Sequence, residues 1–186
     1  MKKRILIACE IFAREIEAGL PQDADVEILW IEAALHARPE RLEEALKAAL
    51  SAAEAIGNDI RVLLGTGCHP DLCSLTDSYG ARLLPAKNCI EAFCGKLSKE
   101  LEANRTMIMT PGWIRAWPGI MKEMGWNEID VRINLGRYDK ILLLEPGIDP
   151  LTEDEILCFF DLVQVPLDIQ PLDLSHFKEI LNEVLR

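Results

Sequence analysis

Short apolar runs alternate with amphipathic segments along the whole chain, and this alternation restricts the fold more than any other feature. The runs are continuously apolar, which is typical of strands buried on both faces of a parallel sheet. We expect strands at residues 4–9, 26–31, 61–64, 82–84, 106–109, 140–144 and 165–169. The segments between them supply helices that cover the sheet.

The helical segments carry recognisable start signals. Pro39 opens a helix whose apolar stripe includes Leu42 and Leu46. Thr152 and Glu155 have the spacing of a capping box, which predicts a helix as far as Val163. Further helices are expected over residues 10–20, 88–103 and 175–185, and Pro118 is expected to break or restart the segment that begins at residue 110.

These elements predict an α/β fold: a mostly parallel central sheet of about six or seven strands flanked by helices, a Rossmann-like sandwich. The 186 residues contain no repeat or linker, so we expect a single domain over residues 1–186.

The composition excludes several classes of function. The net charge of −11 argues against nucleic-acid binding and against docking on anionic membranes. No apolar stretch approaches the length of a membrane span, and the run after Met1 is too short for a signal peptide. We therefore expect a cytoplasmic protein, in which reducing conditions favour metal, redox or core roles for its six cysteines over disulfides.

Three cysteines fall where predicted strands end. Cys9 is the last residue of the first run, Cys68 follows the third, and Cys89 follows the fourth, in the first turn of a predicted helix. In open α/β sheets, ligands bind at the carboxyl ends of the strands. Three thiolates at this edge predict a metal or cluster site, although the alternative of reduced core thiols stays open.

The other three cysteines have different surroundings. Cys94 lies on an apolar helical stripe, and Cys158 lies between Leu157 and Phe159, so both are interpreted as small packing residues. Cys73 is undecided. Cys89 follows Asn88, a good N-cap, and its position at a helix N-terminus predicts a lowered thiol pKa.

Neighbours of the three thiols are candidate binding residues. Glu10 is either a carboxylate ligand or a helix N-terminal charge, and His69 is either a ligand or general acid, or an ordinary loop residue. Trp113 could wall a pocket or pack against Trp117. The turn at Gly65 matches neither a dinucleotide fingerprint nor a P-loop.

Four local patterns, in order, resemble one known family. They are ACE at residues 8–10 with RE at 14–15, GTGCHPDL at 65–72, PAKNCI at 85–90 and TPGW at 110–113. Together they resemble the family catalogued as domain of unknown function 1638. The resemblance implies that the family's cysteines correspond to Cys9, Cys68 and Cys89. The sequence departs from the usual family pattern at His69, Ala86 and Asn88.

The resemblance also implies a setting. Relatives are found in methanogens and other anaerobes, often beside genes for corrinoid-dependent methyltransferases, although no reaction is established. We expect a zinc ion or an iron–sulfur cluster, with a corrinoid as a further cofactor and a methyltransferase or corrinoid protein as partner. The function expected is support of anaerobic one-carbon methyl transfer, and the alternative is a non-catalytic carrier of metal or corrinoid for methyltransferases.

Overall fold

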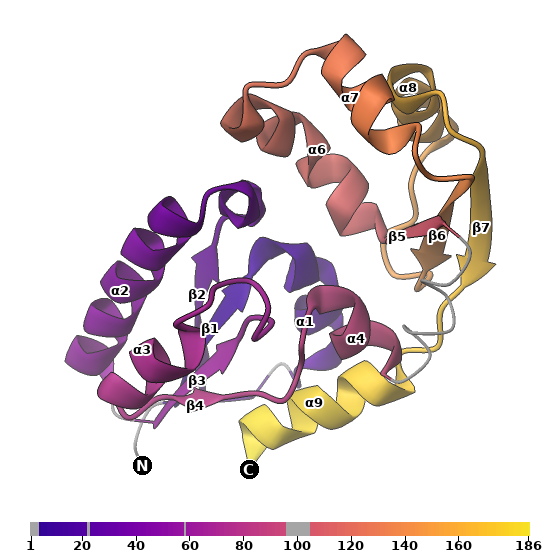
Figure 1. Cartoon of the computed structure of the whole chain (residues 1–186). Coiled ribbons are helices and arrows are strands. Elements are labelled where there is room, and N and C mark those ends of the chain that lie inside the picture. The colour runs from indigo at the N-terminus through magenta and orange to yellow at the C-terminus, as the bar shows by residue number, and fades with distance from the viewer. Residues whose placement is uncertain (1–3, 22, 58, 96–104) are drawn as a thin grey trace.

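The computed structural model describes residues 4–21, 23–57, 59–95 and 105–186, and Figure 1 shows them as two lobes. Its strands are β1 (Arg4–Cys9), β2 (Val26–Ile31), β3 (Asp59–Leu63), β4 (Arg82–Leu83), β5 (Thr106–Met109), β6 (Lys140–Glu145) and β7 (Leu167–Pro171). Two 3-10 helices are η1 (Glu10–Phe12) and η2 (Ala33–Ala37). The α-helices are α1 (Ala13–Gly19), α2 (Pro39–Ile56), α3 (Leu72–Ser78), α4 (Cys89–Cys94), α6 (Pro111–Met124), α7 (Glu128–Leu135), α8 (Glu153–Val163) and α9 (Ser175–Leu185).

All strand pairs in the described residues are parallel. The first sheet has the order β2-β1-β3-β4, and the second has the order β5-β6-β7. In β1, Ile5 and Ile7 pack on the face covered by α2, whereas Leu6 and Ala8 pack on the face covered by α1 and α9. The expectation of a mostly parallel α/β fold is therefore confirmed.

The expectation of one sheet with six or seven strands is wrong, because the strands of the described residues divide into a sheet of four and a sheet of three. The first sheet ends at β4, which has only two residues. After β4, the backbone carbonyls of Ala86 and Lys87 accept hydrogen bonds from the loop that follows β3. These carbonyls are therefore not paired with β5. A buried apolar run looks the same in either sheet, so the sequence pattern did not reveal the division.

The first lobe consists of residues 4–95 and α9, and the second lobe of residues 105–171. In sequence, α9 follows the whole second lobe, but it packs against α1 and α4 of the first (Figure 1). The rings of Phe12, Phe93 and Phe177 meet there, with centroids 5.0–5.4 Å apart. This aromatic contact fixes α9 to the first lobe.

The carboxyl ends of both sheets face the boundary between the lobes. Helix α6, which follows β5, contacts η1 and η2, which follow β1 and β2. Helix α4 also bridges the boundary, because Ile90 and Cys94 pack with Ile108 of β5 and Leu142 of β6. Whether the lobes form a single domain stays a prediction.

Several helices differ from expectation. Pro118 lies inside α6, which continues to Met124. Pro118 is exposed. Its missing N–H removes one backbone hydrogen bond of the helix, but the opposite, buried face of α6 still packs against the core. Helix α7 was not predicted, and the part of the predicted helix 88–103 beyond residue 95 lies outside the described residues. The capping box at Thr152 is confirmed, with reciprocal bonds to Glu155.

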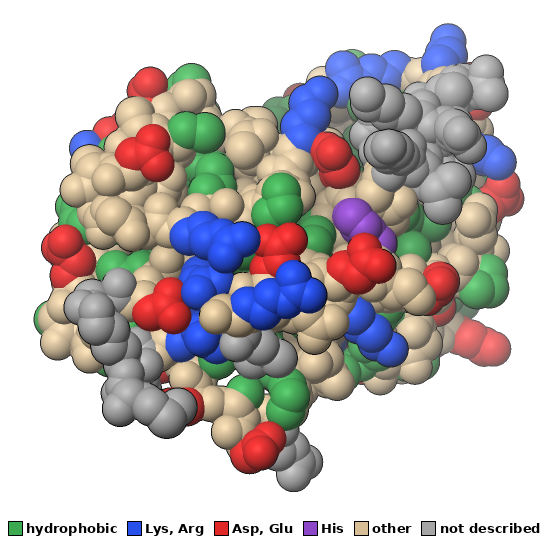
Figure 2. Space-filling view, turned by 90° about the horizontal axis from the view of Figure 1, so that it is seen from below, with side chains coloured by type: hydrophobic (Ala, Val, Ile, Leu, Met, Phe, Trp, Pro, Cys, Tyr) green, Lys and Arg blue, Asp and Glu red, His purple; other side chains and the backbone are tan. Residues whose placement is uncertain are grey.

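Charges of both signs are mixed on the surface. Figure 2 shows basic side chains gathered near the middle of one face with acidic side chains among them. In the first lobe, Arg4 and Arg61 both pair with Asp59, and Arg82 pairs with Glu183 of α9. Within the part of the chain that the structure describes, every helix is too short or too polar to cross a lipid bilayer.

Candidate functional site

The three strand-end cysteines lie at the carboxyl edge of the first sheet. Cys9 ends β1, Cys68 lies in the loop between β3 and α3, and Cys89 is the first residue of α4. All three are partly buried and unoxidised. They pack against the core clusters on the two faces of the sheet, so the sequence-based placement of these thiols at one edge agrees with the fold.

The segments that carry Cys68 and Cys89 are joined directly. The amide of Thr66 donates to the carbonyl of Ala86, and the amide of Gly67 donates to the carbonyl of Lys87, both at 2.9 Å. A side chain at Gly65 would place its Cβ 2.5 Å from the carbonyl oxygen of Lys87. The absence of a side chain at Gly65 therefore permits the close approach of these two loops.

The second lobe reaches the thiols through the start of α6. The indole nitrogen of Trp113 donates a hydrogen bond to the sulfur of Cys89 at 3.0 Å. A Cβ at Gly112 would lie 2.7 Å from the carbonyl oxygen of Ile11, just after Cys9. The segments that contain Cys9, Cys68, Cys89 and Trp113 thus meet at one place on the lobe boundary.

The Cys9 thiol interacts electrostatically with the thiols of Cys68 and Cys89. Burial raises the pKa of Cys9 to about 12, and electrostatic repulsion from Cys89, Cys68 and Glu10 adds to this, while a hydrogen bond from the Ile11 amide opposes it. Ionised thiols at these positions would therefore repel one another, which places them in one electrostatic neighbourhood.

Burial also sets the protonation of the other two thiols. It raises the pKa of Cys89 to about 12, although Trp113 and local amides hydrogen-bond to the sulfur, and it raises the pKa of Cys68. The predicted lowering of the Cys89 pKa by the helix N-terminus is wrong. Desolvation of a buried thiolate outweighs the effect of this six-residue helix.

The side chains near the thiols do not form a closed coordination shell. Among the described residues, no three His, Cys, Asp or Glu side chains are arranged so that they could already hold a metal ion. His69 is buried, but its Nδ1 accepts a bond from the Asp71 amide, and its Nε2 lies 3.6 Å from Glu43. The ring is thus held by the loop and by α2.

Glu10 and Trp113 each interact with one of the thiols. Glu10 is exposed, acts electrostatically on Cys9 and accepts a long bond of 3.4 Å from the Ala33 amide. Trp113 packs edge-on against His36, with ring centroids 5.4 Å apart, and touches core clusters of both lobes. Trp117 instead packs against Phe159. The two tryptophans share the core cluster of the second lobe, but their ring partners differ.

The remaining cysteines separate into two kinds. Cys94 is buried and its thiol donates to the carbonyl of Ile90, as expected of a packing residue. Cys158 is exposed, so its predicted role in packing is wrong, because this side of α8 faces outward. Cys73, which the sequence left undecided, is exposed in α3.

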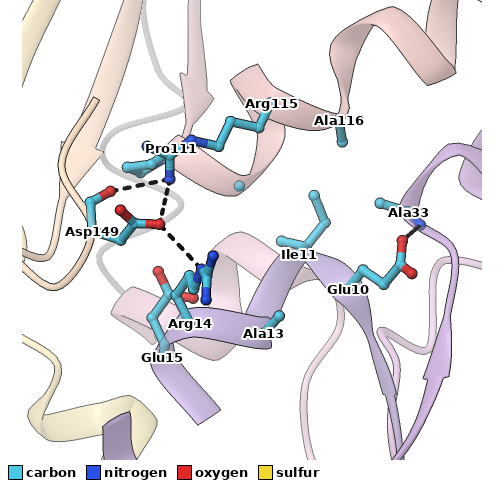
Figure 3. Close-up of a pocket in the computed structure, with 11 residues that line it drawn as sticks. Glu10, Ile11, Ala13, Arg14, Glu15, Ala33, Pro111, Arg115, Ala116 and Asp149 are labelled. Carbon is cyan, nitrogen blue, oxygen red and sulfur yellow. Dashed lines mark hydrogen bonds and ion pairs between the residues drawn. The ribbon is translucent and has the colours of Figure 1, made fainter. Parts of the chain in front are cut away.

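A cavity of about 520 Å³ adjoins the thiol region at the lobe boundary. Its walls come from η1, α1, η2, the start of α6 and the loop after β6. Figure 3 shows Arg14, Asp149 and Arg115 joined by ion pairs at one end, and Glu10 bonded to Ala33 at the other.

Most residues of this cavity had no role predicted from the sequence. The available signal was the family resemblance, whose patterns include Glu10, Arg14, Glu15, Pro111 and Gly112. Arg115 and Asp149 lie in an unremarkable helix and loop, and they join the site only because the two lobes meet.

The model of the family described as "Protein of unknown function (DUF1638)" matches residues 30–181. This range includes Cys68, Cys89 and Trp113 and leaves out Cys9 and Glu10. A comparison with curated proteins found no match, and neither did a comparison with solved structures.

Proposed function

The chain belongs to the DUF1638 family, and on that premise we propose that Cys9, Cys68 and Cys89 bind one metal centre, a zinc ion or an iron–sulfur cluster. The observation that supports this proposal is the convergence of three partly buried thiols from separate strand ends, with mutual electrostatic coupling at Cys9. Soft sulfur donors of this kind select zinc or iron–sulfur clusters over harder cations.

The surroundings of the sulfurs suit such a centre. Each sulfur accepts at least one N–H bond, from the amide of Ile11 at Cys9, from that of Gly65 at Cys68 and from Trp113 at Cys89. Bonds of this type orient thiolate ligands and tune a bound metal. Because the described side chains do not yet form a closed shell, we expect the three thiols to close around the ion on binding.

The reaction that we propose for the centre is support of one-carbon methyl transfer, which follows from the family resemblance. When bound, zinc would supply a Lewis acid and a cluster would supply low-potential electrons. Three protein ligands leave a position open to substrate. Trp113 would hold the Cys89 sulfur and exclude water on one side, and Glu10 would face the incoming molecule.

A second candidate is a non-catalytic carrier that delivers a metal or a corrinoid to a methyltransferase. Its support is that Cys9, Cys68 and Cys89 are each partly exposed, as a site that hands its metal to a partner requires. A carrier should release its metal to a chromogenic chelator within minutes, whereas a catalytic centre should retain it. Equilibrium dialysis with cobalamin tests the corrinoid part of both candidates.

The metal proposal is tested by anaerobic purification, metal analysis and a visible spectrum of each variant. Cys9→Ser, Cys68→Ser and Cys89→Ser should each lose the metal, because each removes one of three ligands. Cys73→Ser, Cys158→Ser and Cys94→Ala are the matched controls and should keep about one centre per chain. A brown protein that contains iron indicates a cluster, and a colourless protein with stoichiometric zinc indicates zinc. Anaerobic protein without metal, or equal losses in both sets of variants, would contradict the proposal.

A further inference from the structure

One carboxylate at the lobe boundary is buried without a cationic partner. Glu15, in the first turn of α1, is only 4% exposed, and its side chain lines the cavity in Figure 3. Among the hydrogen bonds and ion pairs of the described residues, its carboxylate accepts only from its own backbone amide. A buried carboxylate normally pairs with a cation or gathers several donors.

The charges around Glu15 do not compensate it. Burial raises the pKa of Glu15, and the carboxylates of Glu145 and Asp149 raise it further, against a weaker opposing effect of Arg115. The same carboxylate therefore faces two others at the carboxyl end of β6 and in the loop that follows.

The two arginines of the cavity are already neutralised. Arg115 is held by Asp149 and Glu155, and Arg14 is held by Asp149 and Glu17. The two guanidinium groups are thus paired with three carboxylates, and Glu15 adds a fourth carboxylate nearby. The local balance is negative, and it favours a cation as the occupant of the cavity.

We propose that this cavity binds a small organic cation, an alkylammonium or another compact protonated amine, with Glu15 as its counter-ion. Apart from Glu10, the other walls are apolar, as expected for contact with alkyl carbons. They include Ala13, Ala33, Pro111, Gly112 and Ala116. The inference goes beyond the proposed metal centre, since no thiol contributes to it.

The test is a titration of the full-length protein, followed by amide chemical shifts in ¹H–¹⁵N NMR spectra. The probes are methylammonium and tetramethylammonium chloride, with sodium chloride at equal concentration as the ionic-strength control and sodium acetate as the anionic probe. Saturable shifts at Ala13, Ala33 and Gly112 with an ammonium probe alone are the expected result. Saturation by acetate alone, or by no probe, overturns the proposal.

Two isosteric variants identify the counter-ion. Glu15→Gln should raise the Kd for the ammonium probe at least about 10-fold, whereas Glu54→Gln in α2 should change it less than about 2-fold, because Glu54 is exposed and does not line the cavity. Without a probe, Glu15→Gln should unfold at the same or a higher temperature, because it removes an uncompensated buried charge. Unchanged ammonium binding by Glu15→Gln, or a lower unfolding temperature with binding retained, overturns the assignment.

Discussion

The carboxyl edges of the two sheets meet at one boundary, but they carry different chemistry. The edge of the first sheet carries sulfur, with Cys9, Cys68 and Cys89 partly buried beside one another. The edge of the second sheet continues into a loop whose Asp149 pairs with two arginines. At the charged edge the Asp149 carboxylate is already paired with guanidinium groups, whereas at the sulfur edge the thiols are desolvated donors that would gain from a bound metal ion. The difference teaches that the same strand-end geometry can present either charges that pair with one another or donors that await a ligand.

The largest effect should come from the aromatic support behind the sulfur edge. Phe93→Ala should lower the free energy of unfolding by about 3–5 kcal/mol, because Phe93 is fully buried between Phe12 and Phe177. Phe160→Ala in the second lobe is the matched control. It should cost less than about 1 kcal/mol, because Phe160 is 38% exposed on α8. Urea unfolding measures both, and equal costs would remove the contrast between the lobes.

An intermediate effect is expected where the two edges touch. Gly112→Ala should cost about 1–3 kcal/mol, because the new methyl group would lie 2.7 Å from the backbone oxygen of Ile11. The same variant should shift the indole N–H resonance of Trp113, as its bond to Cys89 is displaced. Gly119→Ala in the same helix should cost less than Gly112→Ala, because its new methyl would lie 3.2 Å from the Ala34 side chain and not 2.7 Å from a backbone oxygen. If neither variant moves the Trp113 resonance, the edges are not tightly coupled.

The smallest effect concerns the charged edge and depends on pH. Hydrogen bonds from Arg115, and then from the Thr152 backbone, lower the pKa of Glu155 to about 2, from an ordinary value of 4.5. A lowered folded-state pKa stabilises the fold above the unfolded value, and the benefit is lost as the pH falls toward 2. Wild type should therefore exceed Glu155→Gln by about 1 kcal/mol at pH 7, with the gap closing between pH 4.5 and 2. Urea unfolding across this pH range measures the difference in unfolding free energy between wild type and Glu155→Gln. A difference that does not change with pH would show that the charge of Glu155 does not stabilise the fold.

Sequence reasoning located the thiols well because their positions follow from local rules. Cys9, Cys68 and Cys89 each follow an apolar run, and the ends of parallel strands share an edge whichever way the sheet is extended. The capping box at Thr152 was also local, and it was found correctly.

The features that sequence reasoning missed are long-range. The division into two sheets depends on which runs pair, and continuous apolar runs carry no such information. The bond from Trp113 to Cys89 and the proximity of Glu15 to Asp149 arise only when the lobes meet. The protonation of Cys89 was mispredicted because a helix N-terminus is visible in sequence, whereas the depth of burial is not.

The return of α9 to the first lobe has a consequence for the order of folding during synthesis. The ribosome makes the whole second lobe before it makes Phe177, so the aromatic contact with Phe12 cannot form until synthesis of α9. Until then, the face of the first sheet that α9 covers is exposed to water and to other chains. Contacts between residues so distant in sequence also slow folding. The nascent first lobe is therefore the stage at which this protein would depend most on a chaperone.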